Sequence, residues 1–144
     1  MLVQRILASK DGGAVVTIAP GVSVGEASKM LSEKKIGALI VSSDGETPLG
    51  ILSERDIVRE LGRRGGSCLD LPVDDLMTRN LVSCTASETT DQVLTKMTDG
   101  RFRHMPVMDG PKMIGLISIG DVVKARLDDL SMEKDALEGM IKGY

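Results

Sequence analysis

The pattern of apolar and polar residues in the first half of the chain predicts a mixture of short strands and short helices. A helix is expected after Ser23, because Ser23 and Glu26 have the spacing of a capping box, and Gly37 lies just past its expected end. A second helix is expected to begin at Ser53 and to stop at Gly62. Short apolar runs bounded by turn residues predict the strands, which are 15–18, 38–41 and 49–52.

The second half of the chain shows the same order of predicted elements. A helix is expected over residues 87–97, with a Ser-x-x-Thr start and an end at Gly100, and a last, long helix is expected to begin at Ser118. Residues 63–67, which read Arg-Arg-Gly-Gly-Ser, predict a linker between the halves. The predicted strands are 81–84, 104–108 and 113–117.

The last helix carries an apolar stripe that Lys134 interrupts. Such a stripe packs either on the helix's own domain or on a partner helix, and the sequence leaves both alternatives open. The apolar positions are Val122, Val123, Leu127, Leu130, Leu137 and Ile141.

A short motif occurs twice at equivalent places in the two halves. The segment Gly50-Ile51-Leu52-Ser53-Glu54-Arg55-Asp56 returns as Gly115-Leu116-Ile117-Ser118-Ile119-Gly120-Asp121, so both copies read Gly, two aliphatic residues, Ser, two variable residues and Asp. A repeat of this size predicts two similar structural units and two similar polar sites. Paired sites of this kind favour ligand binding over catalysis.

Length and charge limit the classes of function. The 144 residues fit one compact domain, and a repeat of about 50 residues is marginally stable alone, so the two halves are expected to pack on each other. The net charge of −3 offers no basic excess for a phosphate backbone, and Phe102 and Tyr144 are the only aromatic residues. Binding to nucleic acid is therefore not expected.

The two cysteines and the hydropathy indicate the compartment. Cys68 and Cys84 have no spacing that suggests a disulfide framework, which favours a reduced, cytoplasmic setting. The apolar run at the N-terminus is too short for a signal peptide, and no stretch approaches the length of a membrane span.

Few residues could carry catalysis. His104 is the only histidine, so a metal cluster is not expected and no metal is required. The segment Gly21-Val22-Ser23-Val24-Gly25 matches the G-x-S-x-G elbow of hydrolases, but Ser23 has an ordinary use as a helix cap. A nucleotide hydrolase or an esterase built on Ser23 is the least favoured interpretation, and the protein is not expected to be an enzyme.

Each half thus has the order β-α-β-β-α, with Gly-h-h-Ser-x-x-Asp (h, aliphatic) at the turn from the last strand to the last helix. This arrangement resembles the cystathionine β-synthase (CBS) domain, and two in tandem resemble a CBS pair, or Bateman module. The resemblance implies an α+β fold (α/β-type) of two CBS repeats packed with pseudo-two-fold symmetry, plus an extended C-terminal helix. The expected boundaries are an N-terminal segment at 1–10, repeat one at 11–64, a linker at 65–76, repeat two at 77–126 and a helical extension at 127–144.

The duplicated Ser and Asp have two interpretations. Ser at the N-cap and an acidic residue three positions later satisfy free backbone N–H groups and suit the helix dipole. The same helix N-terminus can bind a phosphate, and a carboxylate can accept hydrogen bonds from both hydroxyls of a ribose. Capping and binding are compatible for the Ser.

The resemblance assigns roles to further positions, because CBS pairs bind adenosine-containing ligands. It implies ribose binding by Asp56 and Asp121, and phosphate binding by Ser53, Arg55, Ser118, Arg103 and His104. The positions expected to frame the base are Thr17, Ile18, Gly37, Ala38, Ser83, Cys84, Thr85, Met105 and Pro106.

Three further features of the sequence bear on the expected binding sites. Gly50 and Gly115 indicate either tight backbone packing or the close approach of a ligand. Arg55 opposes the helix dipole, whereas Gly120 holds the equivalent place, so the two sites are chemically unequal. Cys84 is either a small buried residue or a redox sensor.

The predicted function is that of a non-catalytic regulatory module that senses an adenine nucleotide. The expected ligand is AMP, ADP, ATP or NAD(H), and binding is expected to shift the arrangement of the repeats or of a homodimer that regulates another protein in trans. The alternative is a constitutive dimeric interaction module whose ligand sites are vestigial.

Overall fold

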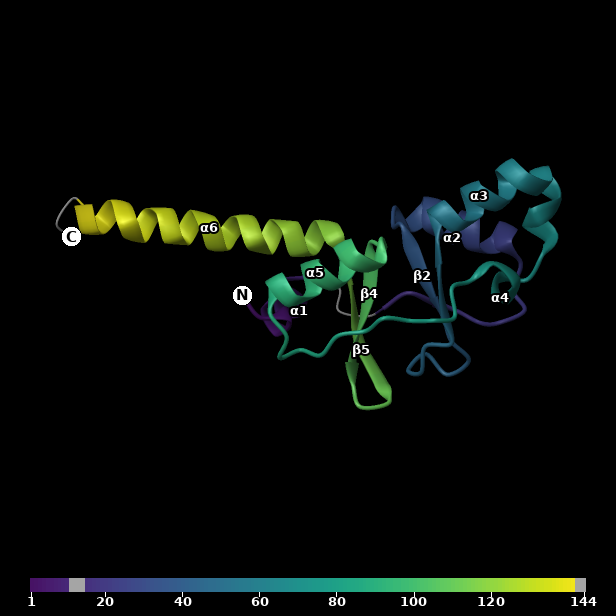
Figure 1. Cartoon of the computed structure of the whole chain (residues 1–144). Coiled ribbons are helices and arrows are strands. Elements are labelled where there is room, and N and C mark those ends of the chain that lie inside the picture. The colour runs from purple at the N-terminus through teal and green to yellow at the C-terminus, as the bar shows by residue number, and fades with distance from the viewer. Residues whose placement is uncertain (11–14, 142–144) are drawn as a thin grey trace. The chain divides into compact units, whose positions relative to one another are not determined.

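The computed structural model describes residues 1–10 and 15–141 (Figure 1). Its mixture of helices and strands confirms the predicted α+β class, and the predicted long C-terminal helix is present. The described residues form two compact units. The first-repeat unit comprises residues 15–81 and 110–114, and the second-repeat unit comprises residues 1–10, 82–109 and 115–141.

The first-repeat unit has the predicted order β-α-β-β-α. Its three-stranded sheet has the order β1-β2-β3, with β1 parallel to β2 and β2 antiparallel to β3. The unit's core contains the apolar faces of these strands and of the helices that follow them. The elements are β1 (Thr17–Ile18), α2 (Val24–Lys34), β2 (Ala38–Val41), β3 (Gly50–Ser53) and α3 (Glu54–Arg64).

Helix starts were predicted better than helix ends in this unit. Ser23 is the N-cap of α2, and its Oγ accepts a hydrogen bond from the Glu26 N–H at 3.1 Å. The helix ends at Lys34, and its C-cap Lys35 adopts the left-handed conformation, two residues before Gly37. Helix α3 continues past Gly62 as far as Arg64, because the helical conformation is open to glycine and the last turn still forms.

Residues 63–67, expected to be a linker, are helical. Arg63 and Arg64 form the end of α3, and a 3₁₀ helix, η1 (Gly65–Asp70), follows directly, with α4 (Val73–Leu76) after it. Cys68 and Val73 are completely buried. Burial of these two side chains holds the segment on the first-repeat unit.

The second repeat itself contains a hairpin and two helices. Strands β4 (His104–Asp109) and β5 (Lys112–Ser118) form a two-stranded sheet, and the helices are α5 (Thr90–Gly100) and α6 (Ile119–Ile141). The predicted strand at 81–84 is wrong. Only Cys84 pairs with the sheet, through a single parallel bridge to Val107, in which its N–H donates to Pro106 O and its C=O accepts from Met108 N.

Helix α5 begins three residues later than predicted. Its N-cap is Thr89, whose Oγ1 accepts from the Gln92 N–H at 3.2 Å while Gln92 Oε1 accepts from the Thr89 N–H at 2.9 Å. This reciprocal capping box fixes the start of the helix. Ser87 lies before the helix, where its hydroxyl is 3.1 Å from Thr85 Oγ1.

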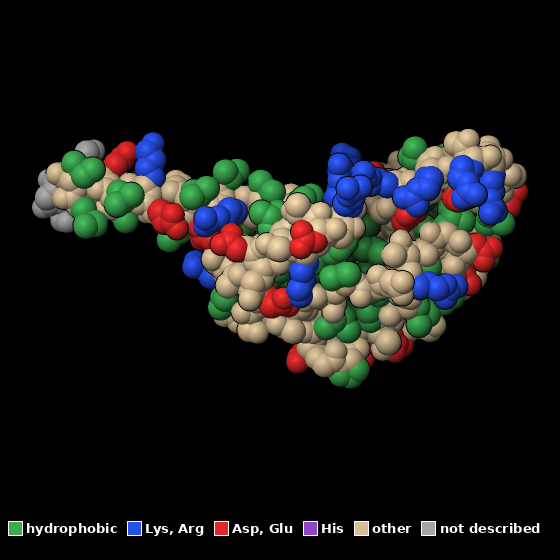
Figure 2. Space-filling model, in the orientation of Figure 1, with side chains coloured by type: hydrophobic (Ala, Val, Ile, Leu, Met, Phe, Trp, Pro, Cys, Tyr) green, Lys and Arg blue, Asp and Glu red, His purple; other side chains and the backbone are tan. Residues whose placement is uncertain are grey.

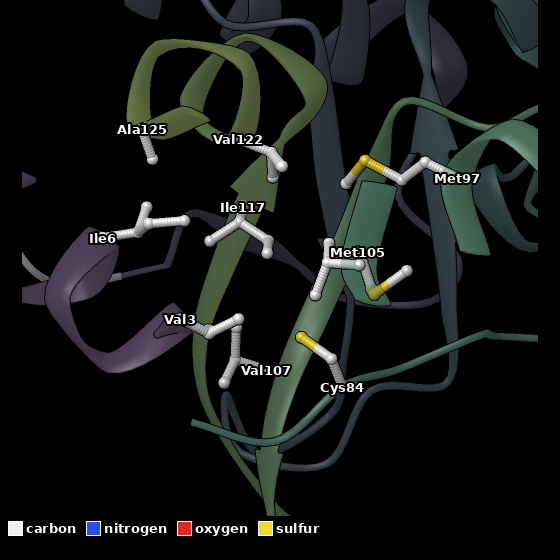
Figure 3. Close-up of a cluster of buried hydrophobic side chains, with 10 residues drawn as sticks. Val3, Ile6, Cys84, Met97, Met105, Val107, Ile117, Val122 and Ala125 are labelled. Atoms are coloured by element: carbon white, nitrogen blue, oxygen red, sulfur yellow. The ribbon is translucent and has the colours of Figure 1, made fainter. Parts of the chain in front are cut away.

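An unpredicted N-terminal helix, α1 (Val3–Ser9), completes the core of the second-repeat unit. Val3 and Ile6 are buried among apolar side chains of the hairpin, α5 and α6 (Figure 3). Helix α4 plays the same part in the first-repeat unit. The Val3 N–H donates to Glu88 O and the Val73 N–H donates to Val22 O, so the segment that precedes each repeat in sequence packs against the other repeat.

Candidate functional site

The first copy of the repeated motif forms the turn from β3 to α3. Ser53 is the N-cap of α3, and its N–H and Oγ donate to Asp56 Oδ2 at 2.9 and 3.0 Å. The Asp56 N–H donates back to Ser53 Oγ at 3.3 Å. Asp56 is only 8% exposed. The capping interpretation of Ser53 and Asp56 is therefore confirmed at this turn.

The other oxygen of Asp56 is less firmly held. Its Oδ1 lies 3.4 Å from Arg59 Nη1, and the Arg59 side chain is mostly exposed. A long ion pair with an exposed partner contributes little free energy, so a hydroxyl group could replace the guanidinium at low cost. At this turn, Oδ2 of Asp56 is held by Ser53, whereas Oδ1 can exchange its partner Arg59 for a hydroxyl group of a ligand.

The second copy forms the equivalent turn from β5 to α6. The Ser118 N–H donates to Asp121 Oδ2 at 2.9 Å, and the Asp121 N–H donates to Ser118 Oγ at 3.1 Å. Both bonds have counterparts between Ser53 and Asp56, which are joined in addition by the bond from Ser53 Oγ to Asp56 Oδ2. The repeated sequence motif therefore corresponds to a repeated hydrogen-bond geometry.

A lysine from the N-terminal segment distinguishes the second turn from the first. Lys10 Nζ donates to Asp121 Oδ2 and to Leu116 O, both at 2.8 Å. Burial alone raises the pKa of Asp121, but the hydrogen bond and charge of Lys10 and the Ser118 amide outweigh it, so the pKa lies below the usual 3.8. The carboxylate is ionised at neutral pH and keeps its capacity to accept hydrogen bonds.

Each turn is completed by the start of the neighbouring strand. The Glu54 N–H donates to Gly37 O at 2.9 Å, and Ala38 pairs with Ser53 in the sheet. In the second-repeat unit, the Ile119 N–H donates to Arg103 O at 2.8 Å. The structure thus brings Gly37 and Ala38 to the first turn.

Arg103 and His104 come to the second turn in the same way. The Arg103 side chain is exposed and His104, the first residue of β4, is half-buried. Arg55 is exposed in the first turn of α3, and Gly120 takes its place in α6, so the predicted chemical difference between the turns is present.

The residues expected to frame the base fall into two groups. Thr17 and Gly37 are half-buried, and Ser83 and Thr85 are exposed at the surface of their unit. The other group is buried or nearly so: Ile18, Ala38, Cys84, Met105 and Pro106. The side chains of Ile18, Ala38, Cys84 and Met105 belong to the cores of their units.

Cys84 is one of these buried residues and is 2% exposed (Figure 3). Burial raises the pKa of its thiol to about 11, with a smaller contribution from Glu88. A thiol that stays protonated at neutral pH reacts slowly with oxidants. Cys84 is therefore a buried apolar residue, and the structure does not support its alternative interpretation as a redox sensor.

The two glycines that open the motif have a packing role. A Cβ on Gly50 would overlap the Met77 side chain and lie 3.0 Å from Thr78 O. A Cβ on Gly115 would come within 2.5 Å of Leu7 Cδ2. Both contacts come from the segments that precede the repeats, so backbone packing explains both glycines.

Comparison with known proteins decides the family. The family model of the CBS domain matches residues 12–63 and 73–128. The chain belongs to the CBS domain family. This CBS pair is 36% identical over 125 residues to the CBS domain-containing protein CBSX3, mitochondrial, of Arabidopsis thaliana, with 84% of the present chain covered. It spans only about 61% of the length of that relative.

Solved CBS structures share the fold of this pair. The CBS-domain containing protein ATU1752 from Agrobacterium tumefaciens is 45% identical, with a TM-score of 0.83 and coverage of 88% of this chain and 99% of that one. The CBS domain pair of protein MJ0100 is 25% identical, with a TM-score of 0.77 and coverage of 90% and 98%. MJ0100 was solved in complex with 5′-methylthioadenosine and S-adenosyl-L-methionine.

Sequence reasoning missed Lys10 as a residue of the second turn of this CBS pair. Position 10 lies in a short N-terminal segment with no motif of its own, and only the folded unit brings it to Asp121. In the described part of the chain, no group of three His, Cys, Asp or Glu residues could hold a metal ion. No helix among the described residues is long and apolar enough to cross a membrane.

Proposed function

We propose that this CBS pair is a non-catalytic sensor that binds the adenosine part of a nucleotide at the two repeated turns. Asp56 and Asp121 accept hydrogen bonds from the ribose hydroxyls. The observation that carries the proposal is the repeated geometry, in which a serine amide fixes one oxygen of each carboxylate at the start of a helix. A fixed, ionised carboxylate is a ready acceptor for a diol.

The helix N-termini next to these carboxylates supply the phosphate-binding part of the proposal. Backbone N–H groups and the positive end of the helix dipole favour an anion there. Ser53 and Arg55 serve this role at the first turn, and Ser118, Arg103 and His104 serve it at the second. The adenosine-containing ligands of MJ0100 support the ligand class, and AMP, ADP, ATP and NAD(H) all contain the adenosine unit.

The regulatory effect follows from differential binding. A ligand that prefers one arrangement of the repeats, or of a homodimer, shifts the population toward that arrangement by its difference in affinity. The regulated target is a separate protein. The free, buried thiols of Cys68 and Cys84 suit a reducing compartment such as the cytoplasm.

Thermal unfolding in the presence of ligands tests the proposal. We expect AMP, ADP, ATP, NADH or 5′-methylthioadenosine to raise the unfolding temperature in a concentration-dependent manner, because a ligand at 100 times its Kd adds about 2.7 kcal/mol of stability. Guanosine monophosphate is the control for the base. If none of the adenosine compounds changes the unfolding temperature at millimolar concentration, the protein is a constitutive interaction module with vestigial sites.

A further inference from the structure

The C-terminal part of α6 extends beyond the rest of the second-repeat unit (Figure 1). An ion pair of the Met1 ammonium with Asp129 Oδ2 at 2.8 Å joins the middle of the helix to the N-terminus of the unit. Beyond it the helix continues to Ile141, and its large apolar side chains are exposed (Figure 2). They are Leu130, Met132, Leu137, Met140 and Ile141.

Five of the seven large exposed apolar residues of α6 follow the spacing of a coiled coil, and Met132 and Met140 lie outside it. From Val123 to Ile141 the intervals alternate between four and three residues, which is the a/d pattern of a heptad repeat. Lys134 takes one a position, where a polar residue restricts how helices can pair. The positions are Val123, Leu127, Leu130, Lys134, Leu137 and Ile141. We call this set the heptad face.

The heptad face differs from the face that packs on the unit. Val122 and Ala125 are the buried residues of α6. With about 100° between successive residues, the heptad face points about 120° away from them. Val123 is accordingly 42% exposed and Leu127 60% exposed. Both lie alongside the unit, yet they remain available to another helix.

We propose that the heptad face pairs with the same face of a second copy of this chain, in an antiparallel coiled coil. In this register Leu127 packs against the partner's Leu137, and Val123 against the partner's Ile141. Lys134 packs against the partner's Leu130, so each buried layer contains at least one apolar side chain. This inference does not depend on the proposed nucleotide sites.

The charges beside the heptad face favour the antiparallel direction. In that arrangement Lys124 of each chain lies beside Glu138 of the other chain, which gives one opposite-charge pair at each end. One like-charge contact forms between the two Glu133 side chains. In a parallel pair, Lys134 would face Lys134 in the core, and Glu133 would face the partner's Glu138 on both sides. Opposite charges at such flanking positions set partner choice and orientation.

Thiol cross-linking of the full chain tests the pairing and its direction. Leu127→Cys and Leu137→Cys are made as separate variants and treated with a short bismaleimide, alone and mixed. We expect a cross-linked dimer in the mixture and none above the wild-type background with either variant alone, because like positions lie about 15 Å apart in the antiparallel register. Wild type is the blank, since Cys68 and Cys84 are buried.

Each other outcome contradicts part of the proposal. Cross-linking of each variant with itself indicates a parallel pair, and no cross-linking in any sample shows that the heptad faces do not meet. Leu130→Asp added to both cysteine variants should abolish the cross-link, whereas Met132→Asp, on the opposite side of the helix, should leave it unchanged. Leu130 and Met132 are both exposed, so neither change disturbs the core, and circular dichroism checks that α6 still forms.

A charge reversal gives an independent test of the register. Lys124→Glu or Glu138→Lys alone should lower the cross-linking yield of the mixed variants about two- to tenfold, because each places like charges at both ends of the pair. The double variant should restore the yield. If the double variant remains as weak as the single variants, Lys124 does not meet the partner's Glu138 and the antiparallel register is wrong.

Discussion

The Lys10 ammonium lies 2.8 Å from Asp121 Oδ2, the carboxylate that we propose binds ribose in the second repeat. The first repeat has no counterpart of this contact among the described residues, because the partner of Asp56 there is Arg59 at 3.4 Å. Lys10 shares Oδ2 with the Ser118 amide, whereas Arg59 lies at the other oxygen of Asp56, so the two proposed sites differ in where the neighbouring cation contacts the carboxylate.

Removal of the Lys10 charge should strengthen binding of an uncharged adenosine compound at the second site. Lys10→Met takes away a cation that neutralises part of the Asp121 charge, and a partly exposed ion pair is worth about 0.2 to 1 kcal/mol, so affinity for 5′-methylthioadenosine should rise about 1.5- to fivefold. Isothermal titration calorimetry measures the effect, with Lys29→Met as the control. A weaker affinity in Lys10→Met would show that Lys10 holds the ligand rather than competing with it.

The pKa of Asp121 should rise toward its ordinary value when Lys10 is removed. Since the folded-state pKa lies below 3.8, the ionised carboxylate stabilises the fold above that pH, and this stability is lost as the pH falls through the folded-state pKa. Carboxyl ¹³C chemical shifts of wild type and Lys10→Met over pH 2 to 6 give the two pKa values. Equal values in the two proteins would contradict the role of Lys10.

The titration of Asp121 can also be followed through the free energy of unfolding. The difference in free energy of unfolding between wild type and Asp121→Asn should be constant above about pH 5 and should shrink below the ordinary pKa of 3.8. Urea unfolding at a series of pH values measures it. If the difference in free energy of unfolding is unchanged at the lowest pH, the charge of Asp121 does not contribute to stability.

Glycine at the opening of each motif should be required for packing. Gly50→Ala and Gly115→Ala should each destabilise the protein by about 1 to 3 kcal/mol, because the new Cβ overlaps Met77 or Leu7. Gly62→Ala is the matched control, since nothing lies within 4 Å of its added Cβ and alanine favours a helix by about 0.5 to 1 kcal/mol. Urea unfolding should therefore give opposite signs for the control and the two motif variants.

The N-terminal helix should be an integral part of the second-repeat unit. Ile6 is 3% exposed in the core that contains Val107 and Ile117, so Ile6→Ala should cost about 2 to 5 kcal/mol. Gln4→Ala, at an exposed position of the same helix, should change the free energy of unfolding by less than about 0.5 kcal/mol. Equal effects of the two substitutions on the urea midpoint would show that α1 does not contribute to the core.

The sequence predicted the parts of this protein that depend on neighbouring residues. Serine caps such as Ser23 and Ser53 act within one helical turn, and the strand pair at 38–41 and 49–52 closes through a local turn. The motif and its repeat then indicated the turns themselves. These local signals were enough to identify the order β-α-β-β-α and the CBS family.

Contacts distant in sequence could not be predicted in this way. Helix α1 has seven residues and would be unstable alone; its formation depends on a core built by residues more than 80 positions later. One signal was present, because Val3 and Leu7 have the same spacing as Val73 and Met77, and all four residues serve equivalent packing roles. The approach of Lys10 to Asp121 depends on the same long-range packing.

Calorimetric titration of 5′-methylthioadenosine and AMP into wild type, Asp56→Asn, Asp121→Asn and the double variant tests the central claim most directly. We predict that each single substitution weakens one class of site by at least about tenfold and that the double variant loses measurable binding, because charge-assisted hydrogen bonds to each ribose are removed. Asp128→Asn, on the exposed surface of α6, should bind like wild type. Unchanged binding in the double variant would contradict the assignment of the repeated aspartates to ribose.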